Sequence, residues 1–402
     1  MISDNRLQWL LMAATNLYLF FLCSTKWNAG YSISLGLVVV VMLIYWKRKK
    51  KIAIPVHKVW LLCYGLFMGL IFLAAVASGK TVVIKSAMNF IFYTIPFWVL
   101  VMALQYKEKP IRAYAQWGLW GGSLVLCGVA FYQHVLQNFP ARLQGPFPNP
   151  NNFALALECL LPFQGWLLWD TWKGEKTAKW EWLGIIPFAC SIVALWMTRS
   201  RGGIAGVFAG MAIVIVYHWI IKRKWSAKKQ IAIFLLFLTS MGICTAFGTV
   251  NLARRKYDGE RVLLWKSSYS MWLDHPVIGV GFGQWSKIYK AKYILPEAKE
   301  PDLPVPHNNF MTFLSTAGLL GGVGYFCFAA GTLLLMMRAI QLHSEEYVCY
   351  AVLWLCLANL IHGMVDNTLY SKSTMRLYFA MWGIGCSIQT SSKGKADYRT
   401  IK

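Results

Sequence analysis

A polar segment that runs into an unusually long apolar stretch decides the fold: residues 303–337 read LPVPHNNFMTFLSTAGLLGGVGYFCFAAGTLLLMM. A helix needs about 20 apolar residues to cross a bilayer. The stretch at 309–337 is longer, so we expect its first turns to stand above the bilayer or the helix to tilt. The residues before it, roughly 251–306, form the only long polar interval in the 402-residue chain. The sequence therefore predicts a membrane bundle interrupted by one large loop.

The rest of the chain has the composition of a membrane protein. Charged residues make up 14% of it, against about a quarter in soluble domains. We predict an all-α polytopic membrane protein, with nine transmembrane helices in 1–250, the large loop in 251–308, and three helices and a tail in 309–402. The first span lacks a basic leader and a cleavage site, so we expect it to be retained. The twelve predicted spans are 7–24, 29–46, 59–78, 83–104, 114–133, 153–169, 182–198, 203–221, 231–250, 309–337, 347–365 and 374–390.

The net charge of +24 follows a topological pattern and does not indicate a nucleic-acid partner. With the N-terminus inside, 23 of the 40 Lys and Arg residues fall on the cytoplasmic side and eight fall in short outer loops. This distribution is typical of multi-pass membrane proteins, and the inner positive charge also attracts anionic membrane lipids. We therefore expect both termini to be cytoplasmic and the large loop to face outward.

Several kinds of site are missing from the sequence. All ten cysteines fall inside predicted spans and no C-x-x-C pair occurs, so we expect neither a disulfide framework nor a thiol metal site. The outward segments hold no D-x-D pair, no H-E-x-x-H, no G-x-S-x-G and no Walker loop. The glycines at 279, 281 and 283 do not have the spacing of a dinucleotide fingerprint. We expect no metal, no cofactor and no nucleotide, and a lipid diphosphate is then the natural activated donor.

Arginines beside predicted helix starts mark candidate anion sites on the outer side. Arg199 and Arg201 precede two glycines at the start of a span, where backbone N–H groups and the helix dipole attract anions. Arg142 lies in a proline-rich loop that ends in Asn152, which can cap the next helix. These side chains are candidates to bind a sugar or a phosphate. The alternatives are that the arginines reach lipid phosphates and that the loop is only a connector.

The large loop supplies a second group of candidates. Arg254, Arg255 and Arg261 suit a diphosphate, because guanidinium groups bind phosphate oxygens in pairs. The alternative is an interfacial helix anchored by Arg and Trp side chains. His307, at the start of the tenth span, can act as a general base near neutral pH, or it can form a helix cap together with Asn308.

At these positions the chain resembles the O-antigen ligase and O-antigen polymerase superfamily. The large loop lies between the ninth and tenth predicted spans, as in that superfamily. Residues 198–202 (TRSRG) resemble its Ser-Arg-Gly element, and residues 261–283 resemble the start of its long loop. His307-Asn308, followed after nine residues by Gly318-x-x-Gly321, resembles the ligase pattern. The resemblance covers about residues 140–370.

The resemblance implies glycan transfer, without metal or ATP, at the periplasmic face of the bacterial inner membrane. The implied donor is a polysaccharide linked to undecaprenyl diphosphate, and the implied acceptor of a ligase is the outer-core sugar of lipid A-core. His307 would take the proton of the acceptor hydroxyl, while Arg201 and Arg261 would hold the diphosphate. A single base without paired carboxylates favours an inverting displacement. Gly318 and Gly321 would allow close helix packing beneath His307.

Two other functions stay open at this point. A polymerase of the same superfamily would join lipid-linked repeat units and use the same residues. A transporter for an anionic lipid would use the arginines without chemistry, and Glu158, inside a predicted span, is the residue that supports it. His362 and Asp366 share one helix face four residues apart; they either orient a substrate or satisfy each other.

Overall fold

The computed structural model describes residues 3–24, 27–50, 56–174, 178–222, 258–300, 302–342 and 346–387. Within these ranges the secondary structure is helical throughout, without a β-strand. Two short 3₁₀ helices, η1 (Ile111–Tyr114) and η2 (Lys179–Gly184), and one π-helical turn, η3 (Tyr289–Tyr293), accompany the α-helices. The α-helices are α1 (Asp4–Ser24), α2 (Asn28–Lys49), α3 (Lys58–Ala77), α4 (Thr81–Phe92), α5 (Ile95–Leu104), α6 (Gln116–Leu136), α7 (Pro150–Lys173), α8 (Ile185–Thr198), α9 (Arg201–Lys222), α11 (Asp258–Asp274), α12 (Trp285–Ile288), α13 (Asn309–Leu342), α14 (Tyr347–Gly363) and α15 (Lys372–Cys386).

The predicted fold class, an all-α polytopic membrane protein, is confirmed. In the described part of the chain, eight helical stretches are long and apolar enough to cross a membrane. The helices α7, α14 and α15 stand where three further spans were predicted, although they do not meet the same criteria of length and hydropathy. The predicted span 231–250 lies outside the described residues, so the total of twelve stays a prediction.

One predicted span is interrupted in the structure. Residues 83–104 form two helices, α4 and α5, that are separated at Tyr93 and Thr94. Pro96 occupies the first turn of α5, where its missing N–H costs nothing, whereas in a helix interior it would remove a hydrogen bond. The Thr94 hydroxyl donates to the carbonyl of Ile91 at 2.7 Å and satisfies part of the broken backbone.

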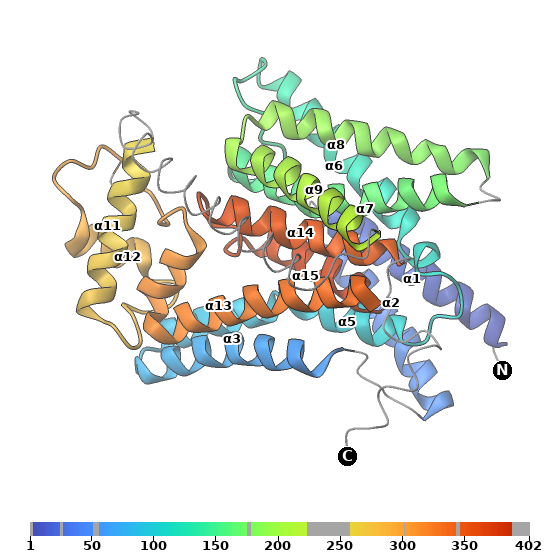
Figure 1. Ribbon diagram of the computed structural model, residues 1–402, viewed down its shortest axis with the longest axis horizontal. Helices are drawn as coiled ribbons and strands as arrows, with labels where there is room; N and C mark the ends of the chain where they lie inside the picture. Colours follow the sequence, from blue (N-terminus) through green and yellow to red (C-terminus); the bar gives the residue numbers. More distant parts are fainter. Residues whose placement is uncertain are drawn as a thin grey trace.

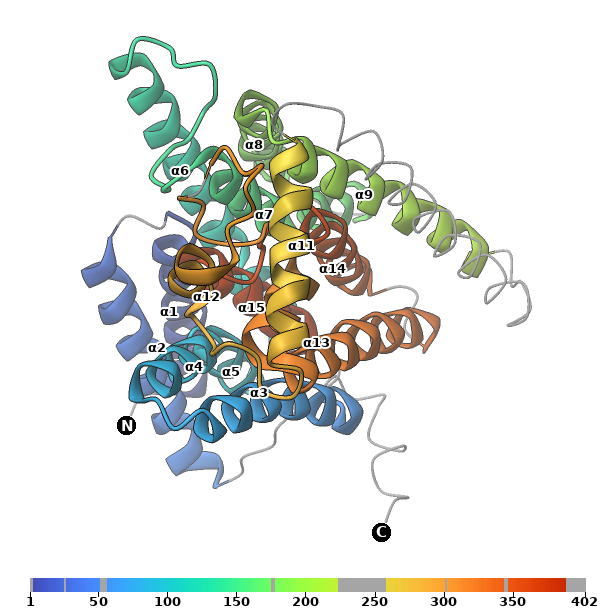
Figure 2. The same cartoon turned by 90° about the vertical axis from the view of Figure 1, so that its left-hand side faces the viewer.

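The membrane bundle is built from pairs of helices that are distant in sequence. The helix α13 packs along α3, α14 along α9, α1 along α6, and α15 along α5 (Figure 1). The N-terminus lies at the end of the bundle opposite to α11. Figure 2 views the bundle from the α11 end and shows α11 lying across it. The α11 end of the bundle therefore carries the segment that was predicted to face outward.

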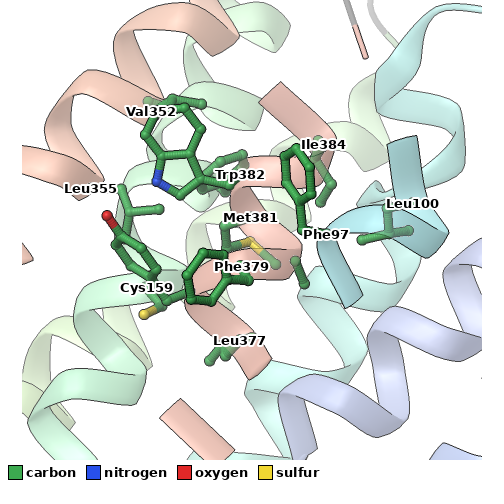
Figure 3. Close-up of a cluster of buried hydrophobic side chains, with 14 of the residues drawn as sticks. Phe97, Leu100, Cys159, Val352, Leu355, Leu377, Phe379, Met381, Trp382 and Ile384 are labelled. Carbon is green, nitrogen blue, oxygen red and sulfur yellow. The ribbon is translucent and has the colours of Figure 1, made fainter. Parts of the chain in front are cut away.

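The helix α15 is the centre of the bundle. Every residue from Leu377 to Cys386 is buried, as expected for a helix that is apolar on all sides. Trp382 and its neighbours pack against Phe97 and Leu100 of α5 and against residues of α7 and α14 (Figure 3). Gly383 lets α15 approach closely, since a Cβ there would lie 2.9 Å from the carbonyl oxygen of Phe97. This packing fixes α7 and α14, which carry part of the site described below.

The segment beyond the end of the bundle has a small core of its own. The residues of α11, α12 and η3 bury one another's apolar side chains, and the Ser267 hydroxyl donates to the carbonyl of Tyr293 at 2.7 Å. The Trp265 indole N–H donates to the carbonyl of Pro306 at 2.9 Å and links α11 to the residue before His307. The buried members of this core are Leu264, Met271, Val280, Trp285, Tyr289 and Tyr293.

Backbone hydrogen bonds attach this outer segment to α13. The N–H of Val280 donates to the carbonyl of Ser315 at 2.9 Å, and the N–H of Leu319 donates to the carbonyl of Pro276 at 2.8 Å. These bonds are possible because α13 is broken at Gly318, where φ is 65° and ψ is −155°. Gly318 thus contacts the outer loop at Val277, which differs from the helix–helix packing role expected from the sequence.

Candidate active site

His307 and Asp366 form a hydrogen-bonded pair at the α11 end of the bundle. Nδ1 of His307 lies 2.9 Å from Oδ1 of Asp366, and the two residues are 59 positions apart. The Asp366 side chain is 8% exposed and that of His307 is 19% exposed. The backbone of His307 has a φ of 52°, which a residue other than glycine rarely adopts and which the surrounding structure must impose.

A ladder of amide hydrogen bonds holds the two turns that carry this pair. The N–H of Asn308 donates to Oδ1 of Asn367 at 3.1 Å. The side chain of Asn309 donates to the Thr368 hydroxyl at 2.6 Å and accepts from the Thr368 N–H at 2.9 Å. Residues 307–309 are therefore bonded one by one to residues 366–368, so the positions of His307 and Asp366 are set by their neighbours as well as by their own contact.

A polar pocket of about 160 Å³ lies on the other side of Asp366. It has four arginines in its lining, and we call it the arginine pocket. The arginines come from three segments: the loop before α7, the turn between α8 and α9, and the first turn of α11. Together they suit an anion with several oxygens, because each guanidinium presents a planar fork of donors. The lining residues are Arg142, Asn151, Arg199, Ser200, Arg201, Gly202, Arg261, His362, Val365 and Asp366.

The turn between α8 and α9 presents two of these arginines. Arg199 ends α8 in a left-handed conformation with φ of 50°, and Arg201 is the first residue of α9. Between them, the N–H of Ser200 donates to the Thr198 hydroxyl at 3.1 Å, and the Ser200 hydroxyl accepts from the N–H of Gly203 at 3.4 Å. Buried hydroxyl groups thus shape the turn, and the arginine side chains are left on its pocket side.

Arg142 connects this turn to Asp366. Its Nε donates to the carbonyl of Thr198 at 2.8 Å, and its Nη2 donates to Oδ1 of Asn151 at 2.6 Å. The Asn151 amide then donates to Oδ2 of Asp366 at 2.6 Å. Asp366 therefore accepts hydrogen bonds on both oxygens, with His307 on one and Asn151 on the other.

The surroundings of Asp366 favour its charged form. Burial opposes ionisation, but the hydrogen bond and the charge of His307, followed by His362 and Arg261, outweigh it and hold the pKa of Asp366 well below its usual range. A carboxylate kept ionised beside Nδ1 of His307 fixes the imidazole with Nδ1 as donor, which leaves Nε2 as the basic nitrogen.

The structure brings together most of the candidate residues expected from the sequence. Arg142, Arg199, Arg201 and Arg261 line the one arginine pocket, and His307 is hydrogen-bonded to its wall at Asp366. Arg261 comes from a segment 60 residues away from Arg201. Arg254 and Arg255 lie outside the described residues.

Of the two candidate asparagines, only Asn308 forms the helix cap that was considered for it. Asn152 does not cap α7: the cap is Asn149, whose Oδ1 accepts from the N–H of Asn152 at 2.9 Å, because Pro150 takes the first helical position and the cap precedes it. Asn151 rather than Asn152 lines the arginine pocket. Asn308 does cap α13, since its Oδ1 accepts from the N–H of Met311 at 3.0 Å, and its amide donates to the carbonyl of Met364 at 2.8 Å.

The sequence alone did not identify the partner of His307. It pointed to an i,i+4 pair of His362 and Asp366, but Nε2 of His362 lies 4.0 Å from Oδ2 of Asp366, and each residue has a closer partner elsewhere. Asp366 bonds to His307, and Nδ1 of His362 lies 2.8 Å from Oε2 of Glu158 on α7. A cue was present in the run Asp366-Asn367-Thr368, three polar residues at the end of a predicted span.

An apolar cavity of about 730 Å³ adjoins the site. It lies among α9, α13 and α14, and its lining includes Asn308 and Met364, whose side chain and carbonyl are hydrogen-bonded next to His307. Val216, Phe326 and Leu334 also belong to its lining and are exposed on the surface of the bundle. The cavity therefore runs from the turn that bears His307 to the side of the bundle that would face lipid.

Comparisons with known proteins give matches that include much of this site. Residues 186–326 match the family model described as O-Antigen ligase, and this range contains Arg199, Arg201, Arg261 and His307. The chain is also similar to the teichuronic acid biosynthesis protein TuaE of Bacillus subtilis (strain 168), with 27% identity over 288 residues. That alignment covers 65% of this chain and 56% of the relative, so the chain spans about half the length of the curated relative it matches.

Proposed function

We propose that this multi-pass membrane protein, a member of the O-antigen ligase and polymerase superfamily, transfers a glycan from a polyprenyl-diphosphate carrier to a hydroxyl group of an acceptor glycan at the outer face of the membrane. The observation that carries the proposal is the convergence of four arginines on one pocket whose wall contains Asp366, the partner of His307. Cations for a diphosphate and a base for a hydroxyl thus lie next to each other.

In the proposed step, Nε2 of His307 takes the proton of the acceptor hydroxyl while the acceptor oxygen attacks the anomeric carbon of the donor. The bond between that carbon and the diphosphate oxygen breaks, and the polyprenyl diphosphate leaves with both electrons. Arg201 and Arg261 stabilise the negative charge that develops on the leaving group. Asp366 stabilises the imidazolium that forms at His307. One direct displacement inverts the configuration at the anomeric carbon.

The apolar cavity fits the carrier's hydrocarbon chain. Its lining is almost entirely hydrocarbon, from Val216 on α9 to Phe326 and Leu334 on α13, and it ends at Asn308 beside the polar site. A polyprenyl chain in this cavity would keep its diphosphate near the arginine pocket. An undecaprenyl diphosphate, the carrier expected from the resemblance, has both the apolar and the anionic part that the two neighbouring sites need.

The identity of the acceptor separates a ligase from a polymerase. The description of the matched family and the spacing from His307 to Gly318 favour a ligase that acts on the outer-core sugar of lipid A-core. The name of the relative TuaE refers to teichuronic acid biosynthesis and not to lipid A-core. The second candidate is therefore a polymerase that extends another lipid-linked glycan. Both reactions use the same base and the same leaving group.

Reconstitution of the purified protein in liposomes tests the transfer itself. We expect a polyprenyl-diphosphate-linked glycan and an acceptor glycan to give a new glycosidic product in the presence of EDTA and without nucleotide. Movement of the donor across the bilayer without any product would instead indicate a transporter. Loss of product on EDTA treatment would contradict the metal-independent step.

Deletion of the gene in its source organism distinguishes the two acceptors. Loss of a ligase leaves lipid A-core without polysaccharide while lipid-linked polymer accumulates. Loss of a polymerase leaves single repeat units on the carrier or on the final acceptor. Accumulation of single units would favour the polymerase over the lipid A-core ligase.

A further inference from the structure

The proposed chemistry makes no use of a second histidine–carboxylate pair that lies deeper in the bundle. Oε2 of Glu158 lies 2.8 Å from Nδ1 of His362, and the two side chains are 0% and 1% exposed. Oε1 of Glu158 has no hydrogen-bond partner in the described part of the chain. Ionisable groups are rarely retained in a membrane-embedded core unless they serve a function. We therefore expect this pair to have a function.

The ring of His362 contacts the arginine turn and lies near Asp366. A Cβ added at Gly202 would lie 2.6 Å from Cδ2 of His362, and one added at Gly203 would lie 3.4 Å from Cε1. The ring thus packs directly on the first turn of α9, which begins at Arg201. The same Cδ2–Nε2 edge of the ring lies near the catalytic pair, with Nε2 4.0 Å from Oδ2 of Asp366.

Glu158 holds the ring from a third helix. It belongs to α7, which packs against α14 and α9, and its bond to Nδ1 fixes the rotation of the imidazole about its side-chain axis. With that bond in place, the Cδ2–Nε2 edge of the ring has a fixed position against Gly202 and near Asp366. Without it, His362 has no other ring partner within hydrogen-bonding distance among the described residues, because Asp366 is 4.0 Å away.

We propose that Glu158 is a positioning residue: through the ring of His362 it sets the spacing between the arginine turn at 199–203 and Asp366, and therefore between the diphosphate site and the base His307. This inference rests on the proposed function. Because a displacement of about 1 Å of reacting groups can cost on the order of 10²-fold in rate, a change at Glu158 should lower kcat. The donor should still bind, since Glu158 does not belong to the lining of the arginine pocket.

The test compares Glu158→Gln with a matched change in the same helix. Gln164 is also fully buried on α7, six residues away, and its amide donates to the hydroxyls of Ser123 and Ser191 at 2.8 and 3.1 Å, outside the site. We expect Glu158→Gln to lower kcat by about 10- to 100-fold, with KM for the donor within about threefold of wild type. We expect Gln164→Leu to lower the melting temperature by a similar amount as Glu158→Gln but to leave kcat within about twofold of wild type. Equal kcat losses in both variants would indicate general destabilisation and overturn the proposal.

A second pair of variants approaches the ring from α9 and does not alter Glu158. Gly202→Ala places a Cβ against the His362 ring, whereas Gly210→Ala, lower on the same helix, places one 3.1 Å from the backbone of Ala358 and from Trp354. We expect Gly202→Ala to lower kcat, and Gly210→Ala to leave kcat within about twofold. A folded Gly202→Ala protein with wild-type kcat would overturn the proposal. Wild-type protein without any transfer would instead refute the proposed function, so the two failures are distinguishable.

Discussion

Nδ1 of His307 lies 2.9 Å from Oδ1 of Asp366, and the other carboxylate oxygen accepts from the Asn151 amide at 2.6 Å. A carboxylate held in this way orients the imidazole and stabilises its protonated form, as the aspartate of a catalytic triad does. The pair joins the turn before α13 to the turn after α14. Through this pair, Asp366 is as important to the proposed reaction as the histidine. The sequence alone left open whether Asp366 orients a substrate or only satisfies His362.

Replacing Asp366 by Asn tests this arrangement. Asparagine keeps the size of the side chain but removes the charge that stabilises the imidazolium, so we expect kcat to fall by on the order of 10²-fold or more while the donor still binds. Rates of glycan transfer by the reconstituted variant, with donor binding measured in parallel, check this. A kcat within twofold of wild type would show that His307 does not depend on the carboxylate.

Removing the imidazole should be more damaging than removing its partner. We expect His307→Ala to lose transfer by about 10²- to 10⁴-fold, the usual contribution of a general base, and to retain polyprenyl diphosphate in the arginine pocket. Copurified lipid, identified by mass spectrometry, reports retention independently of activity. Persistent transfer by this variant would refute the assignment of the base.

Arg261→Lys should impair use of the donor although the charge is kept. Lysine carries a single ammonium group and cannot form the paired hydrogen bonds of a guanidinium with a diphosphate. We expect kcat/KM for the donor to fall by roughly tenfold or more, equivalent to about 1.4 kcal/mol. Arg338→Lys, on α13 and outside the pocket lining, is the control and should behave as wild type. Equal effects in the two variants would indicate that Arg261 only anchors α11.

The depressed pKa of Asp366 predicts how its contribution to stability depends on pH. A carboxyl whose pKa is lower in the folded than in the unfolded state stabilises the fold above the unfolded pKa of about 3.9, and this contribution is lost as the pH falls through the folded pKa. The causes are the hydrogen bond and charge of His307, which outweigh burial. The stability deficit of Asp366→Asn relative to wild type, measured by thermal unfolding in detergent, should therefore narrow between pH 5 and pH 3. A deficit that widens in this range would contradict the sign.

The fold class and the arginines could be predicted from the sequence because each depends on local information. Apolar length alone predicts membrane helices, and Arg199, Arg201 and Arg261 stand beside helix starts, where anions bind. Hydropathy did not predict the break at Thr94, because α4 and α5 are both apolar and the signal is the single residue Pro96.

The pairing of His307 with Asp366 could not be predicted in the same way. The two residues are 59 positions apart, and their contact depends on how the turns around them are bonded to each other. Asn151 is a similar case: three neighbouring asparagines at 149, 151 and 152 have the same chemistry, and only the start of α7 at Pro150 decides which one caps the helix and which one reaches Asp366.

Gly318 is the position at which the outer segment depends on a single backbone conformation. Its φ of 65° and ψ of −155° belong to a region that is essentially restricted to glycine, and a Cβ there would collide with the backbone of Val277 and Ile278. We expect Gly318→Ala to destabilise the protein by about 1–3 kcal/mol and to release the outer segment from α13.

Gly69→Ala is the control, because Gly69 lies within α3 and a Cβ there meets nothing within 4 Å. Limited proteolysis between residues 275 and 306, together with thermal unfolding, should detect the release in Gly318→Ala and not in Gly69→Ala. Because His307 follows this segment, transfer should fall as well. Intact protection from the protease in a Gly318→Ala protein would contradict the prediction. It would mean that the hydrogen bonds to Ser315 and Pro276 form without the helix break at Gly318.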